Sequence, residues 1–233
     1  MAASVTGVPV ATPSVGAATQ RFLTLVYLVM AVGMAVTAAV SGSVSSNPEM
    51  VRRILFDPWF TWGLFFVQLA LVAFLSAAVM RMAPGVAFLV FLAYAALTGV
   101  SLSAIFLFYS QETITSAFVV AAGMFLLSSL AGLLIRRDLS GGAQFVLMIL
   151  LGWMFAYFIS WFFPAGSLIG QTTTAVGILL FAGLTVWDTQ RLKQLAAELA
   201  GRQGMGGMVV LGALTLYLDF INLFLLLLRR SSR

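Results

Sequence analysis

The chain has 233 residues, of which 62% are hydrophobic and 8% are charged, whereas an average soluble domain carries about 25% charged residues. This composition excludes a soluble domain of the same size and indicates an integral membrane protein, in which one helical bundle accounts for the whole length. The formal net charge is +5, but the basic residues are scattered at the ends of apolar stretches, which is typical of topology signals and not of nucleic-acid binding.

The apolar stretches predict seven transmembrane helices, since about 20 residues are needed to cross a core of about 30 Å. In chain order the predicted spans are Phe22–Ser41, Phe60–Met80, Val86–Tyr109, Ile114–Ile135, Phe145–Phe163, Thr172–Gln190 and Met208–Leu228. Pro, Gly, Ser and charged residues separate them, so the connections are predicted to be loops and successive helices to be antiparallel neighbours. The domain organisation is then a flexible tail (1–21), one seven-helix transmembrane domain (22–230) and a short basic tail (231–233).

The basic residues predict the orientation, because Lys and Arg are retained on the cytoplasmic side. One side collects Arg21, Arg81, Arg136, Arg137, Arg191, Lys193 and Arg202, and the other has Arg52 and Arg53 before the last span. The N-terminus is therefore predicted to be cytoplasmic. Seven crossings would place the basic C-terminal residues outside, so either a tail this short is tolerated or the last helix sits within the bundle, short of the far side.

Chemistry-bearing residues are few. Neither cysteine nor histidine is present, which excludes disulfide bonds, thiolate nucleophiles, zinc sites with these ligands, and Ser-His or Cys-His catalysis. We therefore expect that the protein is not an enzyme and binds no cofactor.

Asp219 stands in the apolar run "LYLDFINLFLLLL", about half-way through its span. An unpaired charge at that depth costs on the order of 3 kcal/mol on insertion scales. Thr215 lies four residues before it and Asn222 three residues after it, so the three polar groups share one helical face. That face is predicted to point into the protein.

Asp188 lies near the cytoplasmic end of the sixth span, with Thr185 and Arg191 three residues away on either side. One interpretation is a local ion pair with Arg191 at the membrane surface, worth a few tenths of a kcal/mol. The other is that Asp188 meets Asp219, because a short segment joins their helices. Two carboxylates in a low-dielectric site cannot both ionise cheaply, so they would share a proton and titrate as a unit. With hydroxyl, amide or carbonyl oxygens they would also form a weak Ca²⁺ site along a permeation path.

Four further segments carry a resemblance: "LGALTLYLDFINLFLLLLR", "FAGLTVWDTQRLK", "FLAYAALTGVSLSAIFLFY" and "LLIRRDLSGGAQFVLMILLG". Together with the first span they resemble the bacterial branch of the Bax inhibitor-1 family, over nearly all of Arg21 to Arg230. The resemblance implies six helices around a central C-terminal helix, a bacterial inner-membrane location, and a proton-sensitive Ca²⁺ leak governed by two aspartates. These aspartates correspond to Asp188 in Asp-Thr-Gln and Asp219 in Leu-Tyr-Leu-Asp. The second span has Gln68 where the family often has a glutamate, and Arg81 is its basic candidate for a latch.

The leading hypothesis is therefore a pH-gated Ca²⁺ leak in the lipid bilayer, with Asp188 and Asp219 as pH sensor and weak ion ligands. Arg81 or Arg191 would be the counter-charge, and Thr98, Ser101 and Ser103 would line the path or pack the helices. The alternative is a non-transporting regulator that binds a membrane protease or a stress-response partner. An intramembrane aspartyl protease has two aspartates in its favour, but the chain lacks a Gly-x-Gly-Asp motif at Asp219.

Overall fold

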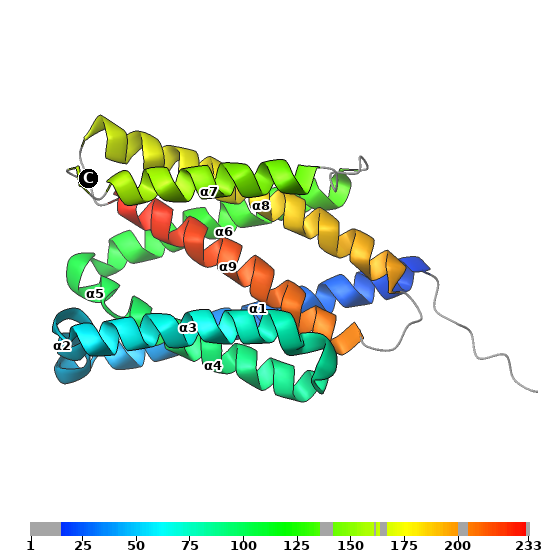
Figure 1. The fold of residues 1–233 in the computed structure, drawn as a ribbon, viewed down its shortest axis with the longest axis horizontal. Helices are drawn as coiled ribbons and strands as arrows, with labels where there is room; N and C mark the ends of the chain where they lie inside the picture. Colours follow the sequence, from blue (N-terminus) through cyan, green and yellow to red (C-terminus); the bar gives the residue numbers. More distant parts are fainter. Residues whose placement is uncertain (1–14, 136–141, 161, 164–166, 200–204, 232–233) are drawn as a thin grey trace, which may run out of the picture.

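The computed structural model describes residues 15–135, 142–160, 162–163, 167–199 and 205–231. Throughout these ranges the regular secondary structure is helical (Figure 1). The elements are α1 (Val15–Ser45), α2 (Pro48–Phe56), α3 (Pro58–Ala78), the 3-10 helix η1 (Val79–Arg81), α4 (Pro84–Leu102), α5 (Ile105–Phe108), α6 (Gln111–Leu134), α7 (Ala143–Ser160), α8 (Leu168–Glu198) and α9 (Met205–Ser231).

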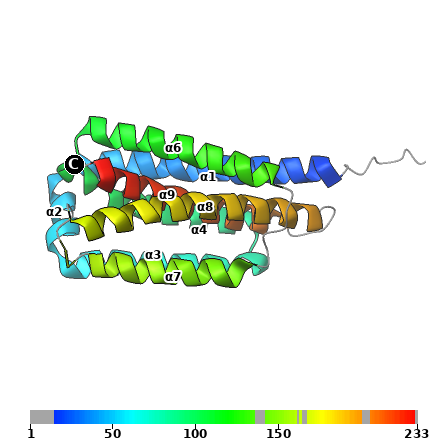
Figure 2. The same ribbon diagram turned by 90° about the horizontal axis from the view of Figure 1, so that it is seen from above.

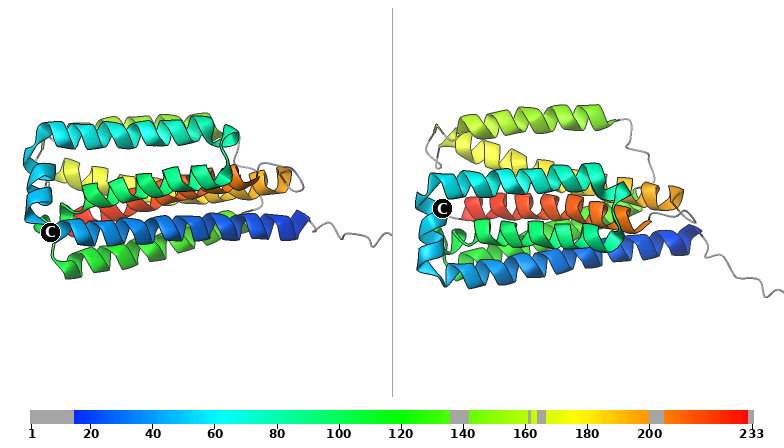
Figure 3. Two further views of the ribbon diagram at one scale, coloured as in Figure 1. Left: turned by 90° about the horizontal axis from the view of Figure 1, so that it is seen from below. Right: turned by 60° about the horizontal axis from the view of Figure 1, so that its bottom comes forward.

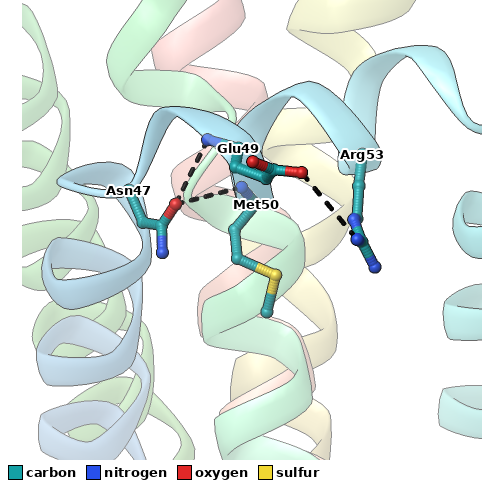
Figure 4. A network of polar contacts seen from close by, with 4 residues as sticks. All are labelled: Asn47, Glu49, Met50 and Arg53. Atoms are coloured by element: carbon teal, nitrogen blue, oxygen red, sulfur yellow. Dashed lines mark hydrogen bonds and ion pairs between the residues drawn. The ribbon is translucent and has the colours of Figure 1, made fainter.

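The helices begin where short polar residues and prolines predict. At the start of α2, the Asn47 side chain accepts hydrogen bonds from the backbone N–H groups of Glu49 and Met50 (Figure 4). The other capping side chains are Asp57 for α3, Ser110 for α6 and Ser167 for α8. Proline occupies the first turn of α2, α3 and α4, where its missing N–H has no intrahelical partner to lose.

The helix α2 corrects the sequence analysis, which placed the segment between the first two spans in a loop. Val51 and Ile54 are buried, whereas Arg52 and Arg53 are exposed, so this helix of nine residues is amphipathic. It joins the end of α1 to the start of α3 across one end of the bundle (Figures 1 and 2). A helix this short, bounded by prolines, has too few turns for its apolar period to stand out in the sequence.

Six helices are long and apolar enough to cross a membrane. They are α1, Pro58–Arg81, Pro84–Phe108, α6, α8 and α9, and each coincides with a predicted span. The predicted fifth span, Phe145–Phe163, corresponds to α7, whose apolar stretch Val146–Ser160 is shorter than the others.

The helix α1 begins at Val15, inside the predicted tail of residues 1–21. The rest of that tail, 1–14, lies outside the described residues, as do residues 232–233 of the predicted C-terminal tail. The first helix is therefore longer than the predicted span at its N-terminal end.

The helix α9 runs between two groups of helices, with α6, α7 and α8 on one side and α3 and α4 on the other (Figure 1). It packs against α1, α4, α6 and α8. In its apolar stretch 72% of the residues are buried, against 11–39% in the other five long apolar helices. Most of the surface of α9 therefore contacts protein.

Large apolar side chains cover the outside of the bundle. On α3, which lies at the edge of the bundle (Figure 3, left), Phe65, Phe66 and Leu69 are all more than half exposed. Leu147 and Phe155 on α7 are exposed to a similar degree. A soluble protein rarely shows so wide an apolar surface. In a membrane, lipid acyl chains would contact this surface.

Candidate functional site

Asp188 and Asp219 lie on α8 and α9, which pack against each other. Their carboxyl groups lie close enough to interact with each other. Asp219 is 6% exposed, and Asp188 is partly buried. Two long helices joined by a short segment thus bring together the two acidic residues that lie in the apolar spans.

A hydrogen bond between these two side chains needs a proton. An ionised carboxylate only accepts hydrogen bonds, so one of the two groups must be protonated for the bond to form. Atom Oδ2 of Asp219 is buried and finds no hydrogen-bond donor in the described part of the chain, although the Thr185 hydroxyl contacts the same carboxyl group. A proton shared with Asp188 would supply a donor to a buried group that otherwise lacks one.

A cavity of about 420 Å³ opens beside Asp188, between the C-terminal part of α8 and the N-terminal part of α9. Asp188, Arg191 and Thr215 are among its lining residues. Arg191 is exposed and acts on Asp188 through its positive charge. The cavity therefore gives access to Asp188, which in turn interacts with the buried Asp219.

The three supporting polar side chains, Thr185, Thr215 and Asn222, each donate to the backbone carbonyl four residues earlier. The donor–acceptor distances are 2.9, 3.1 and 2.8 Å, respectively. Thr185 is fully buried, whereas Thr215 and Asn222 are partly exposed. Of the three, Thr185 is the one placed against the carboxyl group of Asp219.

Arg81, the second predicted counter-charge, lies in η1 and is exposed. The element η1 packs against α9, but within the described ranges Arg81 forms no ion pair with Asp188 or Asp219. Of the two predicted counter-charges, the structure brings Arg191 close to the aspartate pair.

Sequence reasoning missed Tyr217, which is fully buried two residues before Asp219 on α9. Its hydroxyl lies 2.6 Å from Oγ1 of Thr37 on α1. Thr37 also reaches the carbonyl oxygens of Gly33 and Ala95, at 3.0 and 2.9 Å. Because carbonyls only accept, Thr37 donates to them and Tyr217 donates to Thr37. This contact ties the helix of Asp219 to α1.

A second hydroxyl network links α1, α6 and α8. The Tyr27 hydroxyl bonds to the Ser129 hydroxyl, which in turn lies 3.1 Å from the hydroxyl of Thr189. Thr189 directly follows Asp188. The sequence gives little signal for either network, because hydroxyl residues in apolar spans are common packing residues and their partners lie on other helices.

The predicted path residues Thr98, Ser101 and Ser103 lie on or next to α4. Gln68 on α3 donates to the Ser101 hydroxyl at 2.7 Å, and Thr98 donates to a backbone carbonyl of its own helix. Ser103 likewise bonds to a nearby carbonyl, that of Val100. The contact between Gln68 and Ser101 therefore connects α3 to α4.

No cluster of three or more His, Cys, Asp or Glu side chains occurs in the described portion of the structure. The aspartate pair thus offers two carboxyl groups, with the Thr185 hydroxyl beside them. Since Ca²⁺ takes about 6–8 oxygen ligands, most of its shell at this position would come from water and carbonyl oxygens. Such a site suits an ion in transit better than a tightly held one.

The comparison with known families agrees with this architecture. The family model described as "Inhibitor of apoptosis-promoting Bax1" matches residues 19–230. The chain belongs to the Bax inhibitor-1 family. The resemblance seen in the sequence is thereby confirmed, and with six long apolar helices this Bax inhibitor-1 protein is a multi-pass membrane protein.

Its Bax inhibitor-1 relatives match almost end to end. "Inner membrane protein YbhL" of Escherichia coli (strain K12) is 40% identical over 212 residues, which cover 90% of each chain. A protein of Deinococcus radiodurans is 39% identical over 210 residues, covering 90% of this chain and 89% of the relative. One of Borreliella burgdorferi is 34% identical over 212 residues, with 90% of each chain covered. The segment that matches the family model includes both Asp188 and Asp219.

Proposed function

We propose that this Bax inhibitor-1 protein is a pH-sensitive leak for Ca²⁺, gated by a proton that Asp188 and Asp219 share. The observation that carries the proposal is the contact between the two carboxyl groups on adjacent helices, with Asp219 buried within a long apolar helix. Ionisable groups inside membrane spans are costly, and they typically mark ion pathways and proton relays.

The proton acts as the switch because its loss changes the net charge of the Asp188–Asp219 pair. With one proton on the pair, a hydrogen bond holds α8 against α9. When that proton is lost, two negative charges face each other in a low-dielectric site and repel. The contact between the helices therefore weakens as the pH rises, and Ca²⁺ competes with the proton for the same oxygens.

The proposed path uses an arrangement of seven membrane crossings. In this arrangement six crossings surround α9, which is the last crossing, and the N-terminus is in the cytoplasm. Besides the six long apolar helices, α7 is the additional crossing; its 18 residues measure about 27 Å at 1.5 Å per residue, close to the apolar thickness of a bilayer. The cavity beside Asp188 would then be a cytoplasmic entrance, with Arg191 at its mouth.

The test is Ca²⁺ flux into liposomes that contain the purified protein, measured at several pH values around neutrality. We expect flux in the wild type that varies with pH. In Asp188→Asn and Asp219→Asn the pH dependence is lost, because an amide keeps hydrogen-bonding capacity and mimics the protonated carboxyl group. Each variant is expected to hold the flux at the value that the wild type reaches at low pH.

The matched control is Glu112→Gln, which makes the same chemical change in the first turn of α6, where the side chain is exposed. It should leave both the flux and its pH profile unchanged. If the double variant Asp188→Asn, Asp219→Asn retains the wild-type profile, the aspartate pair does not gate the path.

The absence of flux at any pH in the wild type would overturn the leak function. The protein would then be a non-transporting regulator, in which the aspartates only hold α8 to α9. Co-purification of a membrane partner at a stoichiometric ratio would identify that role.

A further inference from the structure

The helices α1 and α6 leave a groove between them on the outside of the bundle. Both pack against α9, and in the view of Figure 2 both lie on the side of α9 that faces away from α3 and α7. Between them are two cavities, of about 570 and about 490 Å³. Met34, Ala38 and Phe118 line both cavities, so the two adjoin, and together we call them the α1–α6 groove.

The floor of the α1–α6 groove is the helix that carries Asp219. Phe220 lines one cavity, and Ile221 and Phe224 line the other. The Phe118 ring packs edge-on against the rings of Phe220 and Phe224, at 5.4 and 6.1 Å between centroids. Phe118 is 43% exposed, so the groove is open on its outer side, where the bilayer lies.

The chemistry of the α1–α6 groove changes along its length. One half is lined by methionine, alanine, leucine and phenylalanine, with the ring of Tyr27 at one wall. The other half adds hydroxyl and amide groups, those of Thr37, Ser41, Ser45, Gln111 and Thr115. Because α1 ends at Ser45 and α6 begins at Gln111, the polar half lies toward the helix ends, at the level of the membrane surface. A membrane lipid has the same polarity profile, polar near the surface and apolar below.

Ser41 adds an independent observation. It lines the α1–α6 groove and is 4% exposed, and its hydroxyl oxygen has no hydrogen-bond partner among the residues that the structure describes. Buried hydroxyl groups are normally paired, since leaving one unpaired costs about 1–3 kcal/mol. A serine hydroxyl is a donor, and the ester and phosphate oxygens of a lipid are acceptors.

We propose that the α1–α6 groove binds one glycerophospholipid from the surrounding leaflet, with one acyl chain along the apolar half and an ester oxygen accepting a hydrogen bond from Ser41. Each cavity lies within the range of about 300–1,000 Å³ that is usual for ligand sites. The bound chain would lie against α9 one to five residues beyond Asp219. The proposal depends on the membrane location of the protein and not on the Ca²⁺ leak.

Two variants on α1 form a matched pair for the test. Ala38 is exposed and lines both cavities, so Ala38→Trp fills the α1–α6 groove without entering the core. Ala39 is also exposed but lines neither cavity, so Ala39→Trp adds the same side chain outside the groove. Gel filtration and circular dichroism check that both variants fold. If Ala38→Trp does not fold, Ala38→Leu takes its place.

The probe is phosphatidylcholine with a diazirine at the end of one acyl chain, mixed into phosphatidylcholine vesicles that contain the protein. After illumination, the labelled peptides are identified by mass spectrometry. We expect labelling at Met34 and Phe118 to exceed that of the exposed face of α3 at Phe65. This excess should fall several-fold in Ala38→Trp and persist in Ala39→Trp. Ser41→Ala should weaken retention by roughly two- to tenfold, the effect of one hydrogen bond.

Native mass spectrometry of the protein purified from membranes identifies the occupant. A retained mass of one phospholipid, lost in Ala38→Trp, supports the proposal. Retention of a free fatty acid or of detergent alone overturns the choice of a phospholipid. The site itself is overturned if the α1–α6 groove and α3 are labelled equally. It is also overturned if Ala38→Trp shows as large an excess of groove labelling over α3 labelling as the wild type.

Discussion

At Gly132 the backbones of α6 and α8 approach each other closely. A Cβ atom at this position would lie 2.5 Å from the backbone carbonyl oxygen of Val186 and 2.9 Å from Cβ of Thr189. Small residues let membrane helices approach in this way, and close packing replaces the hydrophobic driving force that is absent in lipid. Since Thr189 belongs to the hydroxyl network next to Asp188, the absent side chain of Gly132 helps to position the end of α8 that carries the aspartate.

Gly132→Val should therefore destabilise the bundle, because the added side chain meets a backbone oxygen that cannot turn away. We expect a loss of about 1–3 kcal/mol, the usual cost of overpacking, seen as a lower midpoint in thermal or SDS-induced unfolding. Gly123→Val is the control, since it lies on the same helix with open space around the position of its Cβ. Equal midpoints for the two variants would show that α6 does not approach α8 as closely as described.

Asp219 is tolerated in an apolar helix because protein covers it. Its neighbour Tyr217 bonds to Thr37, and Asp188 and Thr185 contact its carboxyl group. The cost of the carboxyl group is thus reduced by partners on α8, while Tyr217 ties the same stretch of α9 to α1. Asp219 can therefore be accommodated in α9 without disrupting the packing of the helices around it.

At the scale of single elements, α2 is held by its caps more than by its charges. Asn47 accepts two backbone hydrogen bonds. At the other end the backbone N–H of Asp57 donates to the carbonyl of Arg53, and its side chain caps α3. The ion pair between Glu49 and Arg53 has an N–O distance of 3.8 Å, but both side chains are more than half exposed (Figure 4). An exposed pair of this kind contributes little.

Asn47→Ala should loosen α2 selectively, because two N–H groups at its start lose their acceptor. The expected local cost is about 1 kcal/mol, measured as faster hydrogen exchange of the α2 amides. Glu49→Gln breaks only the exposed ion pair and is expected to change the exchange by less than about 0.5 kcal/mol. A larger effect of Glu49→Gln than of Asn47→Ala would contradict this account.

At the scale of the whole molecule, the number of membrane crossings decides whether the N-terminus and the C-terminus lie on the same side of the membrane. The chain has no natural cysteine, so single cysteines report membrane sidedness without background. The exposed positions Gln20, Ser46 and Ser231 lie in α1, just after α1 and at the end of α9. They distinguish an odd number of crossings from an even one.

With seven crossings and a cytoplasmic N-terminus, an impermeant maleimide should label Ser46→Cys and Ser231→Cys from outside the cell. Gln20→Cys should react only after the membrane is permeabilised, because Arg21 and the other basic residues keep that end inside. Labelling of Ser231→Cys only after permeabilisation would mean an even number of crossings, with α7 or α9 not passing through.

The sequence by itself determined the class of the protein, most helix positions and the family. Long apolar runs interrupted by Asn-Pro, Asp-Pro and Ala-Pro leave few alternatives, since a lipid-exposed backbone must be helical and proline fixes where helices start. The sequence also singled out Asp188 and Asp219, because an acidic residue in an apolar span is conspicuous. The short α2 was missed because nine residues do not establish a period.

Only the tertiary structure decided which groups meet. Whether Asp188 paired with Arg191 or approached Asp219 depended on how α8 packs against α9, and the helical period of each helix alone is compatible with both. The hydrogen bond of Tyr217 to Thr37 and the α1–α6 groove likewise arise from helices far apart in the chain. In a membrane protein, apolar residues face both the neighbouring helices and the lipid. A span that is apolar on every face therefore does not reveal which face is covered by protein and which by lipid.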